Sequence, residues 1–183
     1  METQNKKFRD ACKNGHLEVV QLRIATVLQN KPKHLMPMIS SENYLSLLWA
    51  CDGGHLKIAE LLMATVLQHS PNDLMPMISS YNYYSLRRAC FNGHIGVVEL
   101  LVATVLQHSP EHLMPMISSK NYMSLYWACN EGLLKLAELL IATVLQHNPD
   151  NLMPMISSEN YASLCWACEN GHFEVVQLLT NYI

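Results

Sequence analysis

The sequence lacks long apolar runs and any excess of positive charge. No uninterrupted apolar stretch approaches the roughly 20 residues that a membrane-spanning helix needs. The opening residues, METQNKKFRDACKNGH, lack the apolar segment of a secretory signal. The formal net charge is −3, whereas proteins that hold nucleic acid through its phosphates carry a basic surface. We therefore expect neither a membrane nor a nucleic acid among the partners.

Signatures of catalysis are also missing. Only seven glycines are present, and none belongs to a glycine-rich loop of the kind that holds phosphate groups. No pair of carboxylates recurs, and no third group recurs to orient a Cys–His pair for nucleophilic chemistry. We predict that the protein is not an enzyme and has no catalytic residue, cofactor or metal.

With 50% hydrophobic and 15% charged residues, the chain is too apolar to be disordered.

Three sequence blocks recur along the chain with one period of 39 residues. LMPMISS and ATVLQ each occur four times, and Ala-Cys-x-x-Gly occurs five times. Self-similarity at a fixed period of this length is the signature of a repeat array. We predict a single array over residues 1–183, with units at about 1–39, 40–78, 79–117, 118–156 and 157–183.

Each unit contains two amphipathic helical segments and a short third piece. In the second unit, the apolar residues that begin at Tyr44 follow the helical spacing i, i+3, i+4, i+7. We expect Ser40 and Ser41 to cap this helix at its start and Gly54 to end it, because glycine takes positive φ without strain. A second helix is expected from about His55 to Gln68. The proline-containing insert after it is expected to form one or two helical turns, and no segment alternates as a strand would.

The turn between the two helices resembles the ankyrin repeat. ACDGGHLKIAELL, which begins at Ala50, is similar to the ankyrin pattern A-A-x-x-G-H-x-x-V-V-x-L-L, and ACENGHFEVVQLL at the end of the chain is closer still. The ankyrin opening T-P-L-H and the β-turn finger are missing, and the ATVLQ…LMPMISS insert replaces that finger. The resemblance implies an all-α, ankyrin-like solenoid of five helix-turn-helix units with short additional helical inserts and no β-sheet. HEAT-like arrays share such a period and remain an alternative.

The cysteines follow the repeat and not a disulfide framework. Five of the six occupy the same repeat position, each directly after an alanine: Cys12, Cys51, Cys90, Cys129 and Cys168. We interpret them as small buried side chains in a reducing, cytoplasmic compartment. A histidine four residues after most of them suggests zinc. However, one Cys–His pair per unit cannot supply four ligands around one ion.

One face of the first helices combines charged and large aromatic residues. The position of Trp49 points away from the apolar face, and the equivalent positions in the other units are Asp10, Arg88, Trp127 and Trp166. Trp, Tyr and Arg dominate the energetics of protein interfaces, and ankyrin-like arrays present this helix on their concave face. We therefore expect partner-binding residues on this face: Trp49, Tyr84, Arg88, Phe91, Trp127 and Trp166. Alternatively, the insert covers this column and Trp49 belongs to the core.

These observations predict a protein–protein interaction module that binds another protein through the first-helix face. A structural or designed consensus-type scaffold without a specific partner is the alternative, because near-identical blocks also fit recent duplication or design. The resemblance permits a host-directed effector that acts in a host cytosol. The apolar side of the last unit, formed by Phe173, Val176 and Leu179 or their neighbours, predicts a contact at the C-terminal end: self-association with another copy, a partner, or further chain.

Overall fold

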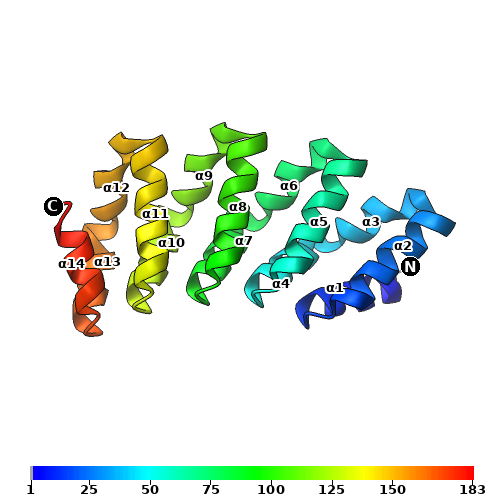
Figure 1. Cartoon of the computed structure of the whole chain (residues 1–183), viewed down its shortest axis with the longest axis horizontal. Helices are drawn as coiled ribbons and strands as arrows, with labels where there is room; N and C mark the ends of the chain where they lie inside the picture. The colour runs from blue at the N-terminus through cyan, green and yellow to red at the C-terminus, as the bar shows by residue number, and fades with distance from the viewer. Residues whose placement is uncertain (1) are drawn as a thin grey trace.

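The computed structural model describes residues 2–183, and in this range every regular element is a helix. Five repeats lie side by side in chain order and form a curved row, with the two termini at opposite ends (Figure 1). Each of the first four repeats contains two long helices, a 3₁₀ turn and a five-residue helix. This arrangement confirms the predicted all-α solenoid with helical inserts.

The elements follow one another as the sequence blocks do. The first repeat contains α1 (Glu2–Lys13), α2 (Leu17–Asn30), η1 (Pro32–His34) and α3 (Leu35–Ile39). The second contains α4 (Ser41–Asp52), α5 (Leu56–His69), η2 (Pro71–Asp73) and α6 (Leu74–Ile78). The third contains α7 (Ser80–Phe91), α8 (Ile95–His108), η3 (Pro110–His112) and α9 (Leu113–Ile117). The fourth contains α10 (Ser119–Asn130), α11 (Leu134–His147), η4 (Pro149–Asn151) and α12 (Leu152–Ile156). The fifth contains α13 (Ser158–Glu169) and α14 (Phe173–Thr180).

Glycine ends each first helix as predicted. Gly54 has a φ of +69°, which a residue with a Cβ adopts only with strain. Its left-handed backbone lets the amide of His55 bond back to the carbonyl of Ala50 at 2.8 Å, which satisfies a free carbonyl at the helix end. The chain then turns directly into α5.

The start of each first helix that follows an insert has a feature that the sequence pattern did not predict. After α6, three consecutive residues of α7, Tyr81, Asn82 and Tyr83, have left-handed backbone angles with φ between 50° and 58°. The same three positions are left-handed in the second, fourth and fifth repeats. Asn tolerates this conformation better than most residues. In the third repeat, the carbonyl of Asn82 accepts hydrogen bonds from Arg87 of the same helix and, at 2.7 Å, from the hydroxyl of Ser119 in the following repeat.

The predicted capping role of the serines is wrong. Ser40 makes no side-chain capping bond to the amides of α4. Its hydroxyl donates instead to the carbonyl of Met36 at 2.8 Å, in the short helix that precedes it. Because the chain passes from α3 into α4 without a loop, the groups within reach of this hydroxyl are the last carbonyls of α3.

The core runs along the whole row between the helices. Successive first helices pack closely against one another, whereas successive second helices touch less extensively, and each short insert helix packs against both its own repeat and the next one. Cys12, Cys51, Cys90 and Cys129 are buried in this core. The expectation is wrong for Cys168, which is exposed because no further repeat packs against α13 in the described chain.

Candidate functional site

The exposed face of the first helices consists of three positions per repeat, spaced at intervals of four and three residues. In α7 these are Tyr84, Arg88 and Phe91, and in α10 they include Met123 and Trp127. The residues between them, such as Leu86 and Ala89, are buried because they face the second helices and the neighbouring repeats. The insert does not enclose this face, since the exposed fraction of Tyr84 is 38% and that of Trp166 is 42%.

The third and fourth repeats bring four of the six predicted residues together. Phe91 of α7 meets Trp127 of α10 edge-on with ring centroids 4.8 Å apart, which is a favourable geometry for aromatic rings. The guanidinium of Arg88 lies 5.0 Å from the centre of the Phe91 ring and is paired with Asp52 of the preceding repeat. Together with Tyr84, these residues line a groove of about 460 Å³ between α7 and α10.

A second groove of about 480 Å³ continues along the same face between α10 and α13. Three residues of α10, Lys120, Met123 and Trp127, line both grooves, so the two hollows form one surface. Lys120 and Tyr126 were not among the predicted site residues. Their contribution depends on the width of the gap between neighbouring first helices. The residue spacing within a single helix gives no information about that width.

The two remaining predicted residues lie outside these grooves. Trp49 is half-buried on α4, with the ammonium of Lys13 5.1 Å from the centre of its ring. This distance permits a cation–π contact between the first two repeats. Trp166 stands exposed on α13 and lines neither groove. The predicted set is therefore a line of residues along the array, with its most enclosed part between α7 and α10.

The Cys–His pairs that suggested a metal ion have separate structural roles. Burial raises the pKa of Cys51 and of Cys90 to about 12, so these thiols remain protonated and are poor nucleophiles or ligands at neutral pH. The ring of His94 bonds through Nε2 to the carbonyl of Asp52 in the preceding repeat at 3.0 Å. His55 and His172 make the same bond one repeat earlier and two repeats later.

These histidine bonds connect neighbouring repeats at their glycine turns. A Cβ at Gly54 would lie 2.6 Å from Nδ1 of His94, so a side chain at this position would overlap the ring. Leu133 occupies the histidine position in the fourth repeat and packs against Gly93 in its place.

No helix in the described range 2–183 is long and apolar enough to cross a membrane. This agrees with the lack of long apolar runs in the sequence.

Comparisons with known proteins place the repeat in a family. A sequence model described as ankyrin repeats (3 copies) matches residues 86–183, which is more than half of the chain. The solved structure of an ankyrin repeat family protein from Legionella pneumophila superposes with a TM-score of 0.50 at 17% sequence identity, and the match covers 95% of this chain and 71% of the other. A search of curated protein sequences found no match. The chain, with helical inserts where the family has its finger, belongs to the ankyrin repeat family.

Proposed function

We propose that this protein binds a partner protein through the exposed face of its first helices, centred on the grooves beside Trp127. Ankyrin repeats are generally protein–protein interaction modules, and their fold is typically not enzymatic. The observation that carries the proposal is the cluster of half-exposed Phe91, Trp127 and Arg88, which gathers on one groove the residue types that dominate interface energetics.

The composition of the grooves suggests the chemistry of the partner. The groove between α7 and α10 is lined by aromatic residues, one methionine and three basic side chains, and none of its described lining residues is acidic. Arg88 is already paired with Asp52. The exposed Lys120 therefore provides the available charge. We propose a partner that places an apolar patch over Trp127 and an acidic group beside Lys120.

Two further expectations belong to this proposal. The deep burial of four thiols supports a reducing, cytoplasmic setting, because such cysteines fill the core as free thiols. The highly exposed Phe173 on α14, together with the half-buried Val176, supports self-association at the C-terminal end of the array. Leu179 does not contribute to that surface, because its side chain is buried.

The test uses photo-crosslinking followed by measurement of affinity. A photoreactive amino acid at Tyr84 or at Trp166 is expected to capture the same partner, which mass spectrometry then identifies. Trp127→Ala is expected to weaken binding of that purified partner by about 2 kcal/mol or more, roughly thirtyfold, as for a central interface residue. Leu145→Ala provides the control, because Leu145 is an exposed apolar residue on the second helix of the same repeat.

The two outcomes are distinct. Loss of affinity in Trp127→Ala with normal affinity in Leu145→Ala supports the first-helix face. If the partner is captured equally well from a crosslinker at Leu145, and Trp127→Ala binds it with unchanged affinity, the proposed surface is wrong. Circular dichroism of each variant checks that the helices are intact.

A further inference from the structure

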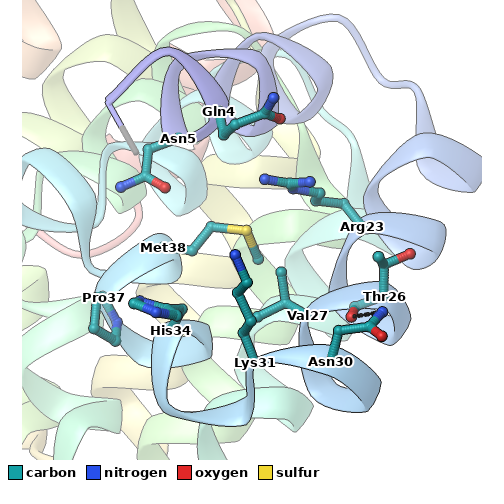
Figure 2. Close-up of a pocket in the computed structure, with 10 residues that line it drawn as sticks. All are labelled: Gln4, Asn5, Arg23, Thr26, Val27, Asn30, Lys31, His34, Pro37 and Met38. Atoms are coloured by element: carbon teal, nitrogen blue, oxygen red, sulfur yellow. Dashed lines mark hydrogen bonds between the residues drawn. The ribbon is translucent and has the colours of Figure 1, made fainter.

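A separate hollow lies in the first repeat, away from the first-helix face. It has a volume of about 420 Å³ and lies between α1, α2 and the insert formed by η1 and α3. Ten residues line it: Gln4, Asn5, Arg23, Thr26, Val27, Asn30, Lys31, His34, Pro37 and Met38. Figure 2 shows Arg23, Lys31 and Met38 pointing toward its centre from different sides.

Two side-chain differences from the other repeats open this hollow in the first repeat. Asn5 stands at the repeat position that Tyr83 occupies in the third repeat. There the tyrosine hydroxyl reaches Nδ1 of His112 at 2.7 Å, so the ring fills the space between the first helix and the insert. His112 is the repeat equivalent of His34. The shorter Asn5 therefore leaves a gap that a tyrosine ring fills elsewhere.

The second difference places a charge in the gap. Arg23 stands where the other repeats have a leucine. All four of these leucines are completely buried: Leu62, Leu101, Leu140 and Leu179. Nε of Arg23 is shielded from solvent and has no hydrogen-bond partner among the residues that the structure describes. A buried donor without a partner is unfavourable, so Arg23 fits this position less well than leucine does. The end of its guanidinium points into the hollow, where a ligand oxygen could meet its terminal nitrogens.

The charged side chains that line the hollow are all basic. Arg23 and Lys31 are basic, His34 adds a ring nitrogen, and no acidic side chain is among the described lining residues. The amides of Gln4 and Asn5 add neutral donors at the α1 side. Guanidinium and ammonium groups beside amide donors form strong charge-assisted bonds to carboxylates and phosphates.

We propose that this hollow binds a small organic oxyanion, a carboxylate or a phosphate monoester on a compact apolar body. The anionic head would lie between Arg23 and Lys31, and the apolar body would lie against Val27 and Met38, which line the same space. The hollow is large enough for a ligand of about one aromatic ring plus its anionic group. This site is independent of the first-helix face, so either proposal stands or fails without the other.

The test titrates the full chain with benzoate and with phenyl phosphate while backbone amide signals are followed by NMR. Binding is expected to shift the amides of residues near 23–38 and to leave those around Trp127 unchanged. Two variants restore side chains that the other repeats carry at these positions, Asn5→Tyr and Arg23→Leu. Both are therefore expected to fold. Each is expected to weaken binding by at least about tenfold, because one fills the space and the other removes the guanidinium.

Lys57→Ser is the control for overall charge, since Lys57 is exposed on α5 and does not line the hollow. Its affinity is expected to equal that of the wild type. Binding of phenyl phosphate alone identifies a phosphate ligand and binding of benzoate alone identifies a carboxylate ligand, and either result supports the site. The proposal is overturned if neither probe shifts these amides, or if Asn5→Tyr and Arg23→Leu bind as the wild type does.

Discussion

At the scale of single residues, the same side chain behaves differently along the array according to what packs on it. Cys90 is completely buried between repeats, whereas the equivalent Cys168 is exposed on α13. Burial disfavours the charged thiolate, and this raises the pKa of Cys90 from 9.0 to about 12. The repeated cysteine is therefore a small apolar core residue wherever a following repeat covers it.

This pKa shift predicts how stability changes at alkaline pH. Above pH 9.0 the thiol of Cys90 ionises in the unfolded chain but stays protonated in the folded one up to about pH 12. The folded state then holds more protons, so the free energy of unfolding falls as pH rises through this window, by up to about 1.4 kcal/mol per pH unit for one thiol. Urea unfolding of Cys90→Ala at a series of alkaline pH values is expected to show a shallower decline than the wild type. Identical slopes for Cys90→Ala and the wild type would contradict the assignment.

At the scale of elements, the glycine turn joins the repeats. Gly54 and Gly171 have similar positive φ angles, but only Gly54 faces the histidine of a following repeat, and a Cβ at Gly171 would meet nothing within 4 Å. Gly171→Ala is expected to cost about 1–2 kcal/mol from backbone strain alone. Gly54→Ala is expected to cost roughly 2–4 kcal/mol, because overlap with the His94 ring adds to that strain.

Thermal or urea unfolding of the two variants measures this difference. Adding His94→Ala removes the overlapping ring, so it should be less harmful in Gly54→Ala than in the wild type, as expected for residues in contact. Equal costs at Gly54 and Gly171, with no coupling to His94, would show that contact between repeats does not contribute at the turn.

The sequence predicted the elements that depend on local pattern and missed those that depend on the neighbouring repeat. The helices and the Gly54 turn follow from apolar spacing and from the freedom of glycine, both of which are local. The left-handed turn at Asn82 was missed for a different reason, since apolar spacing carries no signal for positive φ at residues other than glycine. The line of exposed residues around Trp127 could be predicted from the geometry of one helix. The grooves could not, because each lies between two adjacent helices. The hollow at Arg23 forms because Asn5 does not reach across to the insert as the tyrosine ring of another repeat does, and this reach is known only from the structure.

At the scale of the whole molecule, the two ends of the array differ. The outer positions of α1 are polar or basic, with Lys6 and Lys7 exposed, as suits a terminal repeat. On α14, Phe173 is 79% exposed, whereas the residues at the same position in the other four repeats are partly covered. Apolar side chains are thus exposed at both ends of the described chain, Val19 and Leu22 on α2 and Phe173 on α14, and Phe173 is the most exposed of the three.

The high exposure of Phe173 predicts that the protein self-associates through α14. Two copies related by a two-fold axis would bury Phe173 twice in one interface, and each buried phenyl ring contributes roughly 1.5–3 kcal/mol. Sedimentation velocity over a range of concentrations is expected to show a dimer for the wild type and a dimerisation constant weaker by at least about tenfold for Phe173→Glu. Phe173→Glu is expected to keep the fold, since the side chain is already largely in solvent.

Leu145→Glu places the same charge on an exposed apolar residue in the middle of the array and should dimerise as the wild type does. A wild-type protein that stays monomeric at the highest concentration reached, or a Phe173→Glu variant that dimerises equally well, would rule out this end as the contact.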